Sequence, residues 1–582
     1  MLREAIYHRP KNNWSYAYDR ETIHIRVRTK RDDVVKVTLI HGDKYSWSVI
    51  GSQKIDMNVI SRDHLFDYWH AEVKPTFRRL KYGFKFQSAN DTIWLNEQGF
   101  HESEPENQNL YFDFPFLNPA DVFTPPSWVK DAIFYQIFPE RFANGDPSID
   151  PEDAEPWGGE PKPHNFFGGD LQGIIDHLDY LTELGVNAIY FNPLFEAPTN
   201  HKYDTIDYLK IDPHFGTNEK MKELVEACHS RGIKVLLDAV FNHSGGRFPP
   251  FLDVKENGAE SRYADWFHVR EFPLEVRDRV PTYDTFAFEA HMPKLNTENA
   301  EVQQYLLEVA RYWIEEIGVD GWRLDVANEV DHRFWRKFRD VVKAANPEAY
   351  ILGEIWHDSQ PWLAGDQFDA VMNYPLTDAI LDYAVKETRD GRQFADLVGY
   401  LHAAYPQQAA EVAFNLLGSH DTPRLLTICG EDKRRMKLAT VIQFTLSGTP
   451  CVYYGDEVGL TGEHDPGCRK CMEWDESKQD RDLFRFFAEL IKLRKDHRAL
   501  RDGTYELLYS ESGIQAVAFA REYDCEKFFI ALNAGNVDAT VVVAAGKASS
   551  YEVVFGEAQV DSTGTKVQVA LPPVGFAILR AN

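Results

Sequence analysis

Apolar and polar residues alternate one by one along much of the first 120 residues. The segments Thr22–Thr29 and Val34–Ile40 are two examples. A period of two places successive side chains on opposite faces of a strand, so these segments predict an antiparallel β-sandwich. The proline-rich stretch 118–127 is typical of a linker and is predicted to end this first domain near residue 120.

The rhythm changes after residue 121, where short apolar strands alternate with amphipathic helices such as 302–317 and 334–345. Eight strands are expected, at residues 132–137, 188–192, 234–240, 321–325, 350–354, 370–374, 412–417 and 451–455. Eight consecutive β/α units predict a (β/α)₈ TIM barrel over residues 121–503.

Two further segments complete the predicted architecture. Residues 241–297 are too long for an ordinary loop and show little helical rhythm, so they predict an inserted subdomain beside the barrel mouth. From 504 to 582 the single-residue alternation returns, which predicts a C-terminal β-sandwich. The predicted fold class is therefore α/β, a TIM barrel flanked by two β-sandwich domains.

The composition is that of a soluble globular protein, with 43% hydrophobic and 26% charged residues among 582. The 63 basic and 91 acidic residues give a net charge of −28, which repels nucleic acid and anionic lipid. No apolar stretch is long enough to span a membrane, and the N-terminus does not resemble a secretory signal. The chain is therefore expected to be cytoplasmic, with neither a nucleic acid nor a membrane as partner.

The six cysteines are sparse and irregularly spaced, which fits reduced thiols. Cys468 and Cys471 form a C-x-x-C motif, but a zinc site would need a second pair of ligands and the sequence offers none. A metal-binding or redox role for this pair is disfavoured.

Four carboxylates stand at the ends of predicted barrel strands: Asp238, Asp325, Glu354 and Asp421. The carboxyl ends of barrel strands form the active-site mouth. One Asp at a strand end is usually a cap or turn residue, but four at such ends argue for a site. Clustered carboxylates repel one another, so one should hold a proton, and glycoside cleavage requires such a pair of an ionised and a protonated carboxyl.

Basic and imidazole side chains accompany these carboxylates. Arg323 precedes Asp325 by two residues, so both side chains share one face of the strand, where the guanidinium favours the ionised carboxylate. His243 and His420 supply donors suited to sugar hydroxyls. A metal-dependent hydrolase on the same scaffold would require clusters of histidines at the strand ends, and these are missing.

Four short motifs carry a close resemblance to the α-amylase superfamily, glycoside hydrolase family 13. They are DAVFNH (238–243), GWRLDVANE (321–329), GEIW (353–356) and LLGSHD (416–421). The resemblance implies that Asp325 is the nucleophile, Glu354 the general acid/base and Asp421 the stabiliser of the transition state. It also implies that the cleavage subsite is lined by Arg323, His243, His420 and the stacking ring of Tyr203.

The resemblance narrows to the cyclomaltodextrinase, neopullulanase and maltogenic amylase group. Asn328-Glu329 replaces the Lys-His pair of typical α-amylases, and MPKLN (292–296) is similar to the signature of this group. The resemblance implies a homodimer in which the N-terminal sandwich covers the partner's active site. It also implies cyclodextrins and short maltooligosaccharides as substrates, with pullulan also cleaved and starch attacked poorly.

Further binding residues follow from the same resemblance. Glu329, Trp356 and Tyr374 are expected on the acceptor side, where they tune hydrolysis against transglycosylation. Phe286 in the insert is expected to contact a cyclic ligand, and Asp465 and Arg469 belong to a substrate-binding loop. Tyr45 and Trp47 are candidate aromatics reaching across the dimer, although ordinary sheet packing also explains them.

A structural Ca²⁺ site is also implied, because hard cations take carboxylate, amide and carbonyl oxygens. The side chains implied are those of Asn144, Asp146, Asp150 and Asp170, with carbonyl oxygens from Ile149 and Gly168. Relatives often carry Asn where this chain has Ile149, so only a carbonyl ligand is possible at that position.

Two alternatives remain open at this stage. One is another α-glucan enzyme on the same scaffold, an oligo-1,6-glucosidase or a glucanotransferase. The other is a glucan-binding relative without activity, which is disfavoured because all three catalytic carboxylates are present.

Overall fold

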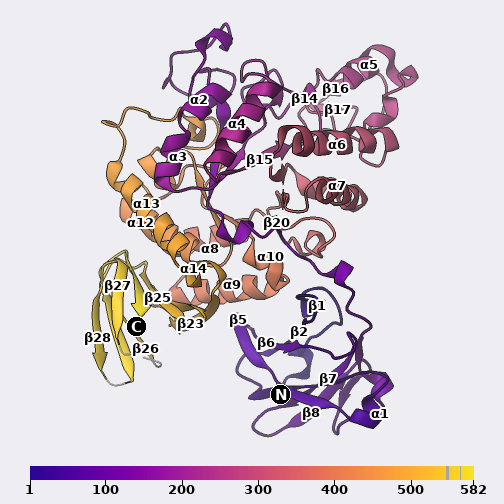
Figure 1. The fold of residues 1–582 in the computed structure, drawn as a ribbon, viewed down its shortest axis with the longest axis vertical. Coiled ribbons are helices and arrows are strands. Elements are labelled where there is room, and N and C mark those ends of the chain that lie inside the picture. The colour runs from indigo at the N-terminus through magenta and orange to yellow at the C-terminus, as the bar shows by residue number, and fades with distance from the viewer. Residues whose placement is uncertain (545–549, 564) are drawn as a thin grey trace.

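The computed structural model describes residues 1–544, 550–563 and 565–582 (Figure 1). Its centre is a parallel sheet with strand order β20-β19-β18-β15-β12-β11-β22-β21. Beyond the two edge strands, a parallel bridge between Met372 and Phe414 nearly closes this sheet into a barrel. The strands are β11 (Phe134–Ile137), β12 (Ala188–Phe191), β15 (Lys234–Ala239), β18 (Gly321–Leu324), β19 (Tyr350–Gly353), β20 (Ala370–Val371), β21 (Phe414–Leu416) and β22 (Thr449–Tyr453). The predicted fold class is confirmed.

Alternation along each strand divides the barrel core into an inner and an outer layer. On β12, Ala188 and Tyr190 belong to the small inner cluster, whereas Ile189 and Phe191 pack in the large cluster under the helices. On β18, Trp322 and Leu324 pack in the large cluster under the helices. Alternation therefore places Arg323 and Asp325 on the inner side. The hydrophobic pattern that builds the barrel therefore also aims polar side chains into its mouth.

Helices wrap the outside of the barrel. They are α2 (Leu171–Asp176), α3 (Leu178–Leu184), α4 (Asn218–Ser230), α6 (Ala300–Tyr312), α7 (His332–Ala345), α8 (Tyr374–Ala384), α9 (Gly391–Ala404), α10 (Gln407–Glu411), α11 (Leu425–Ile428), α12 (Lys433–Thr445), α13 (Arg481–Asp496) and α14 (Ala499–Asp502). Helix α6 continues into a π-helical turn at Trp313–Ile317. Figure 1 shows the helices packed around the central strands.

The insert between β15 and α6 has its own small core. The ladder strands β16 (Val276–Arg277) and β17 (Val280–Pro281) and isolated bridges such as Phe267 with Leu295 tie it together. The expectation of little helical structure was wrong for α5 (Pro249–Asn257). Prolines preset the first helical turn, and Phe251 and Val254 bury one face, a signal too short to stand out in the sequence.

Two antiparallel sheets form the N-terminal domain, with orders β1-β2-β6-β5 and β4-β3-β7-β8-β9, and β10 beside β7. Its elements are β1 (Ser15–Ala17), β2 (Ile23–Lys30), β3 (Lys36–Gly42), α1 (Trp47–Ile50), β4 (Gln53–Asp56), β5 (Asn58–Arg62), β6 (Phe66–Val73), β7 (Leu80–Gln87), β8 (Thr92–Asn96), β9 (Gly99–His101) and β10 (Phe112–Phe114). A separate apolar cluster lies between the sheets, as expected for a sandwich.

The C-terminal domain is a second pair of antiparallel sheets, ordered β23-β24-β25-β30-β27 and β26-β29-β28. Its strands are β23 (Thr504–Ser510), β24 (Ala516–Tyr523), β25 (Glu526–Asn533), β26 (Ala539–Ala544), β27 (Tyr551–Gly556), β28 (Gln559–Thr563), β29 (Lys566–Leu571) and β30 (Gly575–Ala581). Both β-domains pack against α9, the N-terminal one through β5 and the C-terminal one through β23 and β24. Among the described residues, no helix is long and apolar enough to cross a membrane.

Candidate active site

Arg323 is the hub of the barrel mouth. Its Nη1 lies 3.0 Å from both carboxylate oxygens of Asp238 and 2.8 Å from Asp325 Oδ1, and its Nη2 lies 2.9 Å from Glu354 Oε2. The guanidinium is fully buried, so these contacts are weakly screened. One positive charge thus serves three carboxyl groups, and the excess of acid means that the cluster holds at least one proton near neutral pH.

Asp325 keeps one oxygen free. Burial raises the pKa of its carboxyl well above the ordinary value, and the contact with Arg323 opposes that shift. The side chain is almost buried, and Oδ2 has no hydrogen-bond partner among the described residues. A carboxylate fixed through Oδ1, with Oδ2 unoccupied, has the geometry of a nucleophile.

Glu354 is fixed by the residues that follow the two catalytic strands. Its Oε2 accepts a hydrogen bond from the Val326 amide at 2.9 Å, and its Oε1 accepts one from Trp356 Nε1 at 3.1 Å. Val326 adopts a left-handed conformation with φ of 44°. A β-branched residue there costs about 1–3 kcal/mol. This strain turns the amide after the nucleophile strand toward Glu354.

Asp238 is the most heavily partnered carboxylate. Its Oδ2 accepts hydrogen bonds from Tyr190 at 2.9 Å and Tyr203 at 3.0 Å, in addition to the Arg323 contact. Burial raises its pKa to about 6, against the pull of Arg323. With its oxygens engaged, Asp238 orients Arg323 and Tyr203.

A chain of hydrogen bonds sets the tautomer of His420. Gln136 Nε2 lies 3.0 Å from His420 Nδ1 and donates its other hydrogen to Asn192. His420 Nε2 lies 2.7 Å from the Tyr203 hydroxyl and 3.2 Å from Asp421 Oδ2. Burial lowers the pKa of His420 well below its ordinary value, and the nearby arginines add to that shift. The ring is therefore neutral, with its proton on Nε2 facing the mouth.

Asp421 sits at the open side of the cluster. Its side chain is 36% exposed, whereas those of Asp325 and Glu354 are below 10%. Arg469 Nη2 reaches Asp421 Oδ1 at 3.3 Å and is itself paired with Asp465 at 3.1 Å. Burial raises the pKa of Asp421, and Arg469 opposes the shift. The predicted loop residues Asp465 and Arg469 therefore join the site through Asp421.

Two aromatic pairs flank the carboxylates. Trp356 stacks on Tyr374 at 3.6 Å and 10°, and half of the Trp356 side chain stays exposed. On the insert side, Phe286 stacks on His243 at 5.3 Å and 26°. Flat rings beside hydrogen-bonding groups suit the apolar faces of sugars.

The remaining candidates make no direct contact with Arg323 among the described interactions. Glu329 pairs with Lys294 of the MPKLN segment at 3.6 Å, at the junction with the insert. Tyr45 and Trp47 lie in the N-terminal domain, where Trp47 packs on Tyr111 and Tyr45 is 73% exposed. Among the described interactions, neither of these two residues contacts the mouth of its own chain.

Reasoning from the sequence missed the supporting polar network. Tyr190, Gln136 and Asn192 hold Asp238, His420 and Tyr203 in place. The signal was available, because Gln136 and Tyr190 occupy inner-face positions near the ends of the first two barrel strands.

The candidate calcium residues lie in two segments that precede α2, residues 144–150 and 168–170, which we together call the α2 loop. Asn144 donates to both oxygens of Asp150, and a Cβ on Gly168 (φ of 82°) would meet Asp150 Oδ1 at 2.3 Å. The Asn144 Oδ1 oxygen is buried and has no partner among the described residues. An oxygen-only donor set with one orphaned amide oxygen suits a hard cation.

Other members of that set already have partners. Asp170 caps α2 and accepts from the amides of Gly145, Asp146 and Gly173. The Ile149 carbonyl accepts from His214 at 2.8 Å. Among the described residues, the three loop aspartates do not bring ligand oxygens within 4.8 Å of one another.

Comparison with known proteins decides the family. Residues 136–503 match the model described as alpha amylase, catalytic domain, and residues 1–118 match the alpha amylase N-terminal Ig-like domain. The chain belongs to the α-amylase family. It is a glycosidase, as the resemblance had implied.

Individual relatives cover almost the whole chain of this α-amylase family member. A cyclomaltodextrinase from Bacillus sp is 60% identical over 92% of this chain and 96% of its own length. Neopullulanase 2 from Thermoactinomyces vulgaris is 44% identical, with 93% of each chain covered. The solved structure of a cyclomaltodextrinase superposes with a TM-score of 0.95 at 54% identity, covering both chains completely. The predicted subgroup is confirmed.

Proposed function

We propose that this glycosidase hydrolyses α-1,4-glucosidic bonds of cyclomaltodextrins and maltooligosaccharides, with retention of configuration. The observation that carries the proposal is the clamp in which Arg323 holds Asp325 and Glu354 at the two ends of one guanidinium. The names of the relatives, cyclomaltodextrinase and neopullulanase among them, support the class of substrate.

We assign two steps of the proposed reaction to these carboxyls. Glu354 protonates the leaving glycosidic oxygen while Asp325 Oδ2 attacks the anomeric carbon, and a covalent glucosyl-enzyme forms with inverted configuration. Glu354 then takes a proton from water or from a sugar hydroxyl, which attacks the same carbon and inverts it again. Asp421 and the Nε2–H of His420 face the open side, where they bind sugar hydroxyls.

The test is a product assay with a matched variant. Purified protein receives β-cyclodextrin, pullulan or soluble starch, and the products are separated by chromatography. We expect cyclodextrin to be opened faster than starch, and the first products to be α-anomers by NMR. Asp325→Asn should lose at least about 10³-fold in kcat while unfolding at an unchanged temperature, since the amide cannot attack.

Each other outcome rejects a defined part of the proposal. Retained activity of Asp325→Asn above a thousandth of wild type rejects the nucleophile. Faster attack on starch rejects the preference for cyclodextrins but leaves the catalytic residues standing. Cleavage of isomaltose indicates an oligo-1,6-glucosidase, and longer glucans formed from maltooligosaccharides indicate a glucanotransferase.

A homodimer is part of the proposal. Tyr45, Val49 and Ile50 are 73%, 86% and 68% exposed around α1, which has no buried residue. Such a patch on the N-terminal domain suits contact with a second copy. Sedimentation at the mass of one 67.0 kDa chain would reject it. A cytoplasmic location is proposed as well, because a relative in Bacillus subtilis is named intracellular maltogenic amylase, and cell fractionation tests it.

Bound Ca²⁺ at the α2 loop is the third part of the proposal. Asn144 and Asp150 would supply side-chain oxygens beside Gly168, and the ion would neutralise the loop carboxylates. Ca²⁺ added back to chelator-stripped protein should then raise the unfolding temperature of wild type but not of Asn144→Ala. An equal rise in both proteins would place any calcium elsewhere.

A further inference from the structure

The four-stranded sheet of the N-terminal domain has one face that its own core does not use. Along β2, Ile23 and Ile25 point into the sandwich core, so His24 and Arg26 point to the other face. His24 lies opposite Glu72 of β6, and Arg26 lies opposite His70. Directly paired residues share a face, so these four polar side chains stand together.

This face is pressed against the barrel. Arg26 Nη1 donates to the carbonyls of Ala403 at 3.3 Å and Tyr405 at 2.8 Å, so the polar side chains lie at a domain boundary. His24 is 1% exposed. Burying imidazoles costs free energy unless their nitrogens are bonded.

The two imidazoles are not bonded on the side where they meet. Their rings lie 4.4 Å apart, and Nε2 of His24 and Nε2 of His70 are both buried without a hydrogen-bond partner among the described residues. His24 Nε2 lies 3.8 Å from Glu72 Oε1, and one ligand atom from each of the three residues lies within 4.8 Å of the others. Burial lowers the pKa of His24 to about 2 and that of His70 to about 3, so both rings are neutral.

The far side of the His24 ring is fixed. Its Nδ1 lies 3.1 Å from the Tyr16 hydroxyl, which also accepts from the Gln407 amide. When Nδ1 carries the hydrogen and donates to Tyr16, the Nε2 lone pair is left pointing at His70 and Glu72. Histidines that bind metals are oriented by such a bond on their other nitrogen.

We propose that His24, His70 and Glu72 bind a transition-metal ion of the Zn²⁺ type at the boundary between the N-terminal sheet and the barrel. Two neutral imidazoles and one carboxylate form a common zinc ligand set. Ligands about 2.1 Å from a tetrahedral zinc stand roughly 3.4 Å apart, close to the 3.8 Å between His24 and Glu72. Small side-chain rotations therefore complete the site. Calcium, which prefers oxygen, does not suit it.

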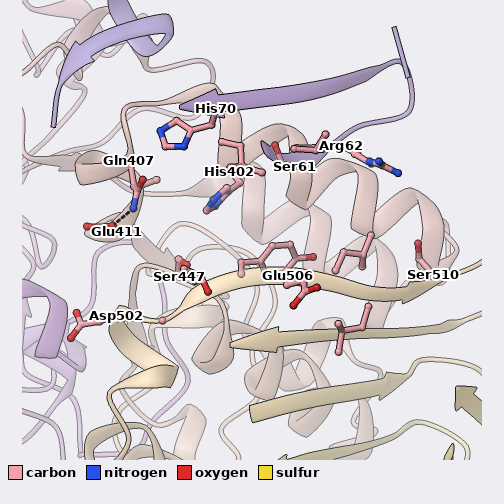
Figure 2. Close-up of a pocket in the computed structure, with 18 of the residues that line it drawn as sticks. Ser61, Arg62, His70, His402, Gln407, Glu411, Ser447, Asp502, Glu506 and Ser510 are labelled. Atoms are coloured by element: carbon pink, nitrogen blue, oxygen red, sulfur yellow. Dashed lines mark hydrogen bonds between the residues drawn. The ribbon is translucent and has the colours of Figure 1, made fainter. Parts of the chain in front are cut away.

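His70 and Glu72 line a cleft of about 670 Å³ between the three domains, so a bound ion would face this cleft with its fourth coordination position. Figure 2 shows His70 on its N-terminal strand, above Gln407 and Glu411 of the barrel. Gln407 donates to Glu411 at 2.8 Å along α10, which lines one side of the cleft. All three ligands belong to the N-terminal sheet, so the ion would brace β2 against β6 on the face that meets the barrel, apart from the carboxylates of the mouth.

The test is a Zn²⁺ titration of the full chain, first stripped with a chelator and then supplied with Ca²⁺ to fill oxygen-rich sites. We expect one zinc per chain by calorimetry and a raised unfolding temperature. Glu72→Gln should weaken binding at least about tenfold, and His70→Gln should abolish it. His64→Ala is the matched control, because His64 is exposed on the same domain, and it should bind zinc like wild type. Co²⁺ in place of zinc should give the visible absorption of a tetrahedral site.

Three results would overturn the proposal. Wild type could show no zinc binding while folded, or Glu72→Gln could bind as tightly as wild type. Binding retained in both His70→Gln and Glu72→Gln would place the zinc elsewhere. If His70→Gln fails to fold, Glu72→Gln still decides, because the Glu72 side chain is 62% exposed and Gln has nearly the same shape as Glu.

Discussion

The barrel mouth and the histidine cluster at the domain boundary are both buried and polar, but they balance charge in opposite ways. In the mouth, Asp238, Asp325 and Glu354 surround one guanidinium and stay within 3.0 Å of it. At the boundary, His24 and His70 are neutral, and their Nε2 atoms have no hydrogen-bond partner in the described part of the chain. The mouth therefore has more carboxyl groups than its one fixed cation can neutralise, whereas the boundary has neutral nitrogens whose lone pairs are available to bind a metal.

The difference shows what each region can do. An excess of carboxyls around a fixed cation keeps one group ionised and leaves another with a proton, which acid/base and nucleophilic chemistry both require. Neutral imidazoles with free lone pairs cannot exchange protons near neutral pH, but they can bind a cation. We therefore test each region by removing the arginine that it contains.

The largest effect is expected from Arg323→Met. Without the guanidinium, the desolvated carboxyls lose the cation that all three contact, and the pKa of Asp325 rises further, which favours the protonated form of the nucleophile. We expect kcat on β-cyclodextrin to fall at least about 10³-fold, and the free energy of unfolding to fall by about 3–5 kcal/mol. Steady-state kinetics and urea unfolding measure the two losses.

The matched change at the boundary is Arg26→Met. It removes two hydrogen bonds to barrel carbonyls but no group of the mouth, so it should lower stability and leave kcat within about threefold of wild type. A kcat loss in Arg26→Met equal to that in Arg323→Met would show that the two regions are not independent. A tenth or more of wild-type activity in Arg323→Met would contradict the role assigned to the clamp.

The part of the site that could be predicted from the sequence is the part set by local periodicity. Arg323 and Asp325 are two residues apart on one strand, so alternation alone puts both in the mouth. The ends of the other strands follow from the closed barrel, and the structure brings Glu354 and Asp421 to the same place. The roles of these residues remain predictions, because the geometry agrees with them but no activity has tested them.

Contacts that depend on register between distant strands were beyond the sequence. His24 and Glu72 meet because β2 and β6 pair in one particular register, and the residues of neither segment predict that register. The same holds for Gln136, whose partner His420 follows β21 and lies 284 residues later in the chain. The short helix α5 was not predicted for another reason, because two buried residues in nine are too few to show a helical period in the sequence.

A smaller effect is expected when acid is applied to the whole molecule, because buried histidines and buried carboxyls change the free energy of unfolding in opposite directions. Burial lowers the pKa of His8, His201 and His243 to about 3. A histidine whose folded pKa is depressed binds its proton only on unfolding, so its contribution is fully present above pH 6.5 and is lost as pH falls toward 3. Each such residue contributes a loss of up to about 1.4 kcal/mol per pH unit in that window.

Asp238 works in the other direction. Its pKa is raised to about 6, so its contribution to stability is present below its ordinary pKa of 3.8 and is lost as pH rises through 6. Burial lowers the pKa of the boundary histidines His24 and His70 as well, to about 2 and about 3. These five histidines outnumber Asp238 and Asp456, whose pKa values are raised to about 6 and about 7, so urea unfolding at constant ionic strength should show stability falling from pH 7 to pH 5. Asp238→Asn removes the opposing contribution and should make the fall steeper. A flat or rising stability in wild type over this range would mean that the histidines are not held neutral, and the contrast between the two regions would fail.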